Sequence, residues 1–175
     1  LPVTETLLPK LLADAGYAAG AVGKWHLGAA PCFRPQARGF TDSFGFLGGG
    51  HMYEPVTNKA TGAVADWKDE YQAPLLKNGA EQPFDGYMTD LLSREAAAFV
   101  ARHRAEPFFL YLAYNAVHTP LQAPEKYLAR LPHIADSRRR TYAAMNVAMD
   151  DGIGQLLAAL RENGLDQNTQ VWFFS

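Results

Sequence analysis

The sequence is poor in three features that would narrow its function at once: cysteine, excess charge of one sign, and long hydrophobic runs. Its single cysteine, Cys32, excludes an internal disulfide and leaves the redox compartment undecided. Its 16 basic and 18 acidic residues leave a net charge of −2, so no nucleic acid or anionic membrane partner is expected. The longest apolar run, residues 108–114, is far shorter than the ~20 residues of a membrane-spanning helix. No membrane span is therefore expected in this chain.

Cys32 also lacks the surroundings of a reactive thiol. Pro31 and Phe33 flank it, and no base lies nearby in the sequence. We therefore expect Cys32 to have a structural role rather than a nucleophilic one.

The residues that are present indicate an α/β domain. With 48% hydrophobic and 19% charged residues, the chain can bury a sizeable core. Apolar residues at helical spacing predict three helices, over residues 7–15, 86–104 and 137–163. Short apolar runs without polar alternation predict three buried strands, over residues 17–22, 108–114 and 171–175. This alternation of helices and strands predicts a parallel sheet flanked by helices.

Two local features refine this pattern. Thr6 is expected to cap the first helix, and Asp85 or Thr89 the second. Residues 28–85 are rich in glycine and proline, which predicts a long excursion with short pieces of strand or hairpin. A connection of this length in a compact domain is usually functional.

Cationic side chains follow the predicted strands. The run Gly-Lys-Trp-His-Leu-Gly places Lys24 and His26 after the first strand, and His118 follows the second. Because the carboxyl ends of parallel strands meet at one edge of a sheet, these side chains are expected at a common site. Lysine supplies a fixed positive charge for a sulfate or phosphate oxygen, and histidine can donate a proton near neutral pH. His51, after a run of three glycines, is placed to reach the same pocket.

Each of these residues also has an ordinary structural interpretation. Lys24 alone is typical of a surface lysine, and His26 of a hydrogen-bonded structural histidine. His118-Thr119-Pro120 alone is typical of a turn. Trp25 is expected to pack rather than react. Asp150 and Asp151 are adjacent within a predicted helix and point in different directions, so no metal ligand is assigned.

Five segments of the chain, taken in order, resemble the sulfatase family. They are "LPKLLADAGYAAGAVGKWHLG", "RGFTDSFGFLGGGHMY", "GYMTDLLSREAAAFV", "PFFLYLAYNAVHTPLQAPEKY" and "YAAMNVAMDDGIGQLLAALRENGLDQNTQVWFFS". The resemblance covers nearly all of the chain, and the G-K-W-H-L-G and H-x-P elements in this order are specific.

The resemblance implies an alkaline-phosphatase-like fold, a mostly parallel sheet flanked by helices, and hydrolysis of sulfuric esters. It also implies a formylglycine nucleophile, made from the cysteine of a C-x-[PS]-x-R motif, and a Ca²⁺ ion that holds the sulfate. By motif position, Lys24 matches the lysine that contacts the sulfate and the nucleophile, and His26 matches the histidine that hydrogen-bonds the formylglycine and assists sulfate release. His118 matches the histidine beside the bridging oxygen, the candidate acid for the leaving alcohol. His51 falls in a region that lines the substrate pocket, so it is expected to bind substrate.

The chain departs from the family pattern in the parts that carry the nucleophile and the metal. No C-x-[PS]-x-R motif occurs, since Cys32 is followed by Phe33-Arg34-Pro35. The aspartates and asparagine that bind Ca²⁺ and a later lysine are also absent. We therefore expect residues 1–175 to be an internal part of a sulfatase catalytic domain, with an incomplete sheet and no activity alone. The N-terminal nucleophile and metal segment, and the C-terminal part, would lie outside it.

The resemblance leaves further questions open. The substrate class is expected to be a sulfated small molecule or carbohydrate, and relatives suggest a periplasmic or secreted protein. The oligomeric state is not assigned. A phosphodiesterase or phosphonate hydrolase of the same superfamily remains an alternative, because the two anions are similar tetrahedra. A non-catalytic relic or binding module remains another.

Overall fold

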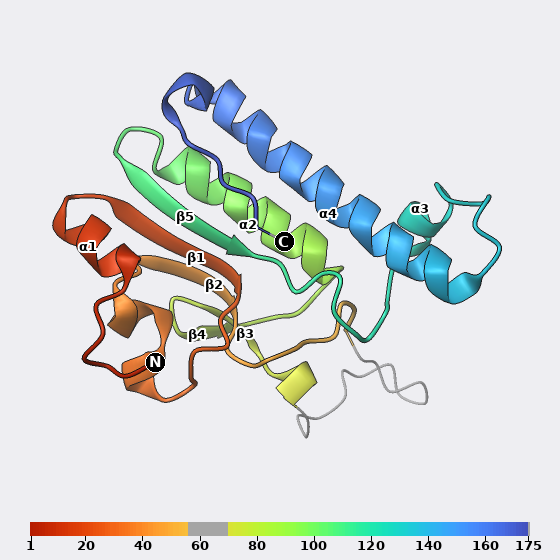
Figure 1. Cartoon of the computed structure of the whole chain (residues 1–175), viewed down its shortest axis with the longest axis horizontal. Helices are drawn as coiled ribbons and strands as arrows, with labels where there is room; N and C mark the ends of the chain where they lie inside the picture. The colour runs from red at the N-terminus through yellow and green to blue at the C-terminus, as the bar shows by residue number, and fades with distance from the viewer. Residues whose placement is uncertain (56–69, 175) are drawn as a thin grey trace.

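The computed structural model describes residues 1–55 and 70–174, and a five-stranded sheet lies at its centre (Figure 1). The strands are β1 (Ala18–Lys24), β2 (Asp42–Phe46), β3 (Leu75–Lys77), β4 (Ala80–Gln82) and β5 (Phe108–Ala113). Their order across the sheet is β4-β3-β2-β1-β5. β1 pairs in parallel with both β2 and β5, whereas β3 pairs antiparallel with β2 and with β4. The predicted parallel sheet is therefore confirmed at its centre, and the predicted excursion adds an antiparallel edge.

Helices cover both faces of this sheet. The long helices α2 (Met88–Arg102) and α4 (Ser137–Glu162) lie side by side on one face (Figure 1). The other face carries α1 (Leu8–Asp14) and the 3₁₀ turns η1 (Pro31–Phe33) and η2 (Pro35–Arg38). The remaining short elements are η3 (Glu70–Gln72), α3 (Glu125–Leu128) and η4 (Asp166–Asn168). No helix in the described part of the chain combines the length and apolarity needed to cross a membrane.

β1 is buried on both faces, as its uninterrupted apolar run predicts. Val22 packs into the main core with Leu92 of α2 and Met145 of α4. Its neighbour Ala21 points to the opposite face and packs with Phe40. A strand enclosed in this way leads directly from the core to its carboxyl end, where Lys24 begins the candidate site.

The predicted caps of the first two helices are wrong. α1 begins after Leu7 without a side-chain cap from Thr6, and α2 begins after Tyr87 without one from Asp85 or Thr89. The backbone N–H of Met88 donates instead to the carbonyl of Tyr53 at 2.8 Å. A residue distant in the sequence therefore accepts a hydrogen bond from the first turn of α2, where the sequence predicted a local side-chain cap.

The predicted strand over residues 171–175 is also wrong for the residues that the structure describes. Residues 171–174 form no strand, and their large apolar side chains are exposed. β5 is the edge strand of the sheet, and residues 171–174 do not pair with it or with any other strand of the described chain. An apolar segment forms a buried strand only when a neighbouring strand takes its backbone hydrogen bonds.

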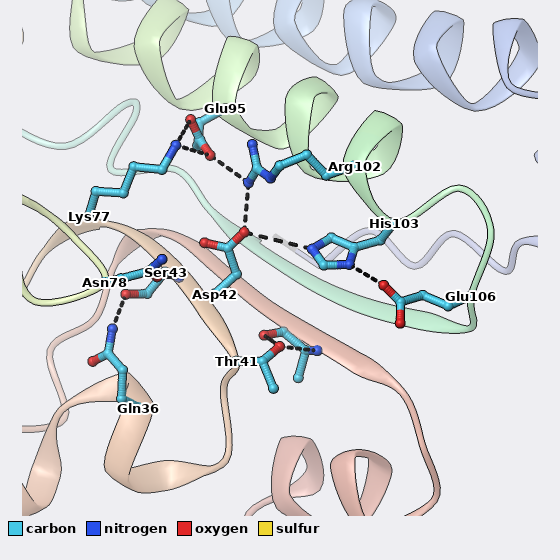
Figure 2. A network of polar contacts seen from close by, with 11 residues as sticks. Gln36, Thr41, Asp42, Ser43, Lys77, Asn78, Glu95, Arg102, His103 and Glu106 are labelled. Atoms are coloured by element: carbon cyan, nitrogen blue, oxygen red, sulfur yellow. Dashed lines mark hydrogen bonds and ion pairs between the residues drawn. The ribbon is translucent and has the colours of Figure 1, made fainter.

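A network of charged side chains joins α2 to the sheet away from the strand carboxyl ends (Figure 2). The Arg102 guanidinium donates to Asp42, the first residue of β2, and to Glu95, in each case at 2.7 Å. Lys77 of β3 donates to the same Glu95 carboxylate at 3.1 Å. Burial lowers the pKa of Arg102, but its bonds to Asp42 and Glu95 outweigh that effect and raise it overall. The network therefore fixes α2 against β2 and β3.

Candidate active site

The carboxyl ends of β1, β2 and β5 approach one another more closely than side chains would allow. Gly23 of β1 is in register with Gly45 of β2 and with Ala113 of β5. A Cβ atom on Gly23 would lie 2.0 Å from the Ala113 carbonyl oxygen, and the residue has a φ of +116°. A Cβ atom on Gly45 would lie 2.0 Å from the Gly23 carbonyl oxygen. Only glycine fits at these positions, which explains the first glycine of the Gly-Lys-Trp-His-Leu-Gly run.

Trp25 fixes the chain between the two cationic residues of this run. Its buried indole donates to the Phe33 carbonyl at 2.8 Å and meets the Phe40 ring edge-to-face at 5.7 Å. Its backbone N–H donates to Phe46 at 3.0 Å. The expectation that Trp25 packs is therefore confirmed, and its two sequence neighbours are held at the end of β1.

Lys24 and His26 flank this tryptophan with different exposure. Lys24 is the last residue of β1 and is half-buried, while His26 is exposed with a φ of +54°. Neither side chain has a hydrogen-bond or ion-pair partner within residues 1–55 and 70–174. A left-handed φ in a residue other than glycine is uncommon and is often found at functional sites. This part of the sheet edge thus offers an accessible imidazole and an ammonium group with no counter-charge from the described part of the chain.

His118 lies in the loop that follows β5, the strand beside β1. Its ring is exposed, and Nδ1 faces the Thr119 carbonyl at 2.7 Å. Because a carbonyl oxygen can only accept, Nδ1 carries the hydrogen and Nε2 is left as the nitrogen for proton exchange. The backbone N–H of His118 donates to the Asn115 carbonyl at 2.8 Å and closes a turn.

The structure therefore brings Lys24, His26 and His118 to the same edge of the sheet. β1 and β5 are adjacent and parallel, with Gly23 level with Ala113, so both loops leave the sheet at the same end. No hydrogen bond or ring contact joins the three side chains in the described part of the chain. Their common placement follows from topology, as the sequence pattern predicts, and their catalytic and substrate-binding roles stay predictions.

His51 does not lie at this surface, contrary to the expectation that it contacts substrate. Only 1% of His51 is exposed. Its Nδ1 and Nε2 face the carbonyls of Met52 and Ala73, both at 2.7 Å. The rings of Phe46 and Phe84 lie 5.0 and 5.1 Å from its own. Both ring nitrogens are occupied by backbone, so the geometry indicates a structural residue that joins two parts of the excursion.

Tyr53 is a site residue that the sequence did not reveal. It is fully buried, and its hydroxyl donates to the carbonyls of Asn115 at 2.6 Å and His118 at 3.0 Å. A buried tyrosine usually finds a hydrogen-bond partner, but this one is separated from Asn115 by 62 positions. No local signal in the sequence connects the two segments.

The described residues do not supply the metal and nucleophile that the family resemblance implies. Among them, no group of three or more His, Cys, Asp or Glu side chains could hold a metal ion. Ca²⁺ takes six to eight oxygen ligands, largely from carboxylates, as a rule. Cys32 is a free, exposed thiol in η1, outside the nucleophile motif. These residues therefore do not fit a calcium site or a formylglycine.

Known proteins match the whole chain. The family model described as Sulfatase matches residues 1–175. Arylsulfatase J of Mus musculus is 35% identical over 100% of this chain and 29% of its own length. N-acetylgalactosamine-6-sulfatase of Homo sapiens is 35% identical over 100% of this chain and 33% of its own length.

A solved structure agrees in fold as well as in sequence. The crystal structure of Ps i-CgsB in complex with k-i-k-neocarrahexaose is 44% identical, with a TM-score of 0.85 over 94% of this chain and 38% of that protein. The chain thus spans about a third of the length of the curated relatives it matches. The expected alkaline-phosphatase-like α/β fold is confirmed.

Proposed function

This chain belongs to the sulfatase family, and we propose that its full-length protein hydrolyses sulfuric esters. Residues 1–175 would form part of the catalytic domain, with the nucleophile and the Ca²⁺ ligands supplied by segments outside them. The observation that carries the proposal is the half-buried ammonium of Lys24, which has no partner among residues 1–55 and 70–174 and lies at the same sheet edge as His26 and His118. A lysine at a strand end that has no carboxylate partner nearby can bind an anionic group of the substrate.

Lys24 and His26 would act on the anion. The ammonium of Lys24 would bind sulfate oxygens and stabilise the charge that develops on them as the ester bond breaks. His26, exposed two residues later, would hydrogen-bond the same group from the adjoining turn. The roles that we propose for the described residues are to bind the sulfate and to protonate the leaving oxygen.

His118 would protonate the leaving group. With Nδ1–H held by the Thr119 carbonyl, a charged ring carries its second proton on Nε2. Nε2 would transfer this proton to the bridging oxygen as the S–O bond breaks, so the alcohol leaves neutral and the ring returns to its neutral tautomer. The proton would matter most when the leaving alkoxide is strongly basic.

A sulfated carbohydrate is the substrate class that we propose. It is supported by the relatives' names, which include an N-acetylgalactosamine-6-sulfatase, and by the oligosaccharide in the Ps i-CgsB complex. Periplasmic or secreted localisation is proposed from the family resemblance alone, and fractionation of the native host would test it.

The test is turnover by the full-length protein of nitrophenyl sulfate and of bis(nitrophenyl) phosphate. We expect the sulfate ester to be preferred, and Lys24→Ala to lower its kcat/KM by about 10²–10³, as for the loss of one well-placed charge donor. Lys10→Ala is the matched control, because Lys10 is exposed and forms an ion pair with Asp14 on α1. Preference for the phosphate diester would favour a phosphodiesterase, and no turnover of either would favour a binding module.

A further inference from the structure

The buried side chain of Tyr53 contacts the turn that carries His118. The Tyr53 hydroxyl donates to the carbonyls of Asn115 at 2.6 Å and His118 at 3.0 Å, the two ends of one turn. The Asn115 carbonyl also accepts the His118 backbone N–H at 2.8 Å. The hydroxyl and the turn therefore share an acceptor, and the turn cannot move without breaking a buried hydrogen bond.

Tyr53 is itself fixed on several sides. Its backbone N–H donates to the side chain of Gln122 at 2.8 Å, and its carbonyl accepts from Met88, the first residue of α2. Its ring packs near that of Tyr87, with centroids 6.0 Å apart. Burial, with a smaller contribution from Tyr87, raises the pKa of Tyr53 well above its usual range. The hydroxyl therefore remains a donor at every pH at which an enzyme of this kind would work.

The His118 side chain makes one described hydrogen bond, and its ring also lies near that of Tyr71, with centroids 6.5 Å apart. Its ring is exposed, and its described hydrogen bond is to the carbonyl of the next residue, Thr119, in the same loop. The hydrogen bond from Nδ1 to the Thr119 carbonyl ties the orientation of Nε2 to the backbone of the loop, and Tyr53 holds that backbone. Tyr53 would therefore act on the reaction through His118, without touching substrate itself.

We propose that Tyr53 is the positioning residue for His118, fixing the turn of residues 115–118 so that Nε2 faces the leaving oxygen. The proposal rests on the proposed function, because it concerns the acid of that reaction. A misplacement of about 1 Å in a reacting group can lower a rate about 10²-fold. Tyr53→Phe keeps the buried ring and removes only the donor, so we expect kcat to fall roughly 10- to 100-fold with KM little changed.

The first experiment is a double-mutant cycle in the full-length protein, with Tyr53→Phe, His118→Ala and both. Two substrates are compared, a sugar sulfate with a basic leaving group and nitrophenyl sulfate with a weakly basic one. We expect Tyr53→Phe to slow the sugar sulfate more than the aryl sulfate. In the His118→Ala background it should have no further effect, because the acid that it positions is already gone.

Tyr87→Phe is the matched control. It removes the hydroxyl of a second buried tyrosine, which donates to the Gln122 carbonyl at 3.0 Å rather than to the turn of residues 115–118. We expect this variant to affect the two substrates equally. A loss from Tyr53→Phe that persists in the His118→Ala background, or that matches Tyr87→Phe on both substrates, would overturn the positioning role.

A second measurement does not depend on sulfatase activity. Hydrogen–deuterium exchange of the full-length protein should show faster exchange for residues 115–122 in Tyr53→Phe, with α4 unchanged. Unchanged exchange in that segment would refute the proposal whatever the kinetics. If the wild-type protein turns over no sulfate ester, the proposed function fails, while the exchange result still decides whether Tyr53 holds the His118 turn.

Discussion

Replacing Gly23 by alanine should disrupt the place where three strands converge. The added Cβ would lie 2.0 Å from the Ala113 carbonyl oxygen and 2.7 Å from its carbon, and both atoms belong to the backbone of β5. Backbone atoms cannot rotate away as a flexible side chain would. The ends of β1 and β5 must therefore separate, which displaces Lys24 on one side and the His118 loop on the other.

Backbone strain and overpacking both contribute to the expected loss of stability. Gly23 has a φ of +116°, and holding a residue with a side chain in such a region costs about 1–3 kcal/mol. Forcing an extra carbon into a packed site costs about 1–3 kcal/mol more. The free energy of unfolding should therefore fall by about 2–6 kcal/mol. A separation of about 1 Å between the strands should also lower kcat about 10²-fold.

The assay is urea unfolding together with turnover of nitrophenyl sulfate by the full-length protein. Gly154→Ala is the control, because Gly154 lies exposed in α4 with nothing within 4 Å of an added Cβ. That substitution should raise stability by up to about 1 kcal/mol through helix propensity, with unchanged activity. The same carbon atom is thus added at two glycines, and it should lower the free energy of unfolding at Gly23 and raise it at Gly154. If Gly23→Ala unfolds at the wild-type urea concentration and keeps its kcat, the close approach of β1 and β5 does not matter.

Two further predictions concern buried side chains around the site. His51→Ala should reduce stability by about 3–5 kcal/mol, as for other buried aromatic side chains, and leave KM unchanged; a raised KM with wild-type stability would restore His51 as a substrate contact. Tyr53 and Tyr87 should make the protein sensitive to alkali, because burial raises the pKa of both hydroxyls. The folded state keeps protons that the unfolded chain loses above about pH 10, so stability is unaffected below that pH and falls above it by about 1.4 kcal/mol per pH unit for each tyrosine. Denaturation measured between pH 9 and about 11.5 should show this slope, and Tyr53→Phe should reduce it by one group's share; an equal slope in wild type and variant would contradict the assignment.

The elements that sequence predicts well are those whose burial is visible in their own residues. β1 has an uninterrupted apolar run because both of its faces are covered, and α4 begins after Asp136, whose side chain accepts from the Arg139 N–H at 2.7 Å. Residues 171–174 have the same apolar composition but form no strand. An apolar composition shows that a segment can form a buried strand. Whether a neighbouring strand is present to pair with it depends on residues outside that segment.

Some residues of the candidate site could likewise be placed from sequence, and others could not. Lys24, His26 and His118 could be placed from sequence because each follows a strand, and the topology of a parallel sheet brings strand ends together. The roles of His51 and Tyr53 could not, because their hydrogen bonds cross to distant segments. The partner of His51 Nε2 is 22 positions away, and those of the Tyr53 hydroxyl are 62 and 65 positions away.

A histidine after three glycines is typical of a side chain delivered by a flexible loop, and that pattern led to the substrate-contact prediction for His51. The contacts of the folded chain reverse it. Phe46 comes from β2 and Phe84 from the segment before α2, and together they enclose the imidazole while two carbonyls take its nitrogens. Two residues later, the tyrosine with no chemical signature of its own reaches the His118 turn. In this segment, burial gives the histidine a structural position, and the tyrosine is the residue that we propose to position His118.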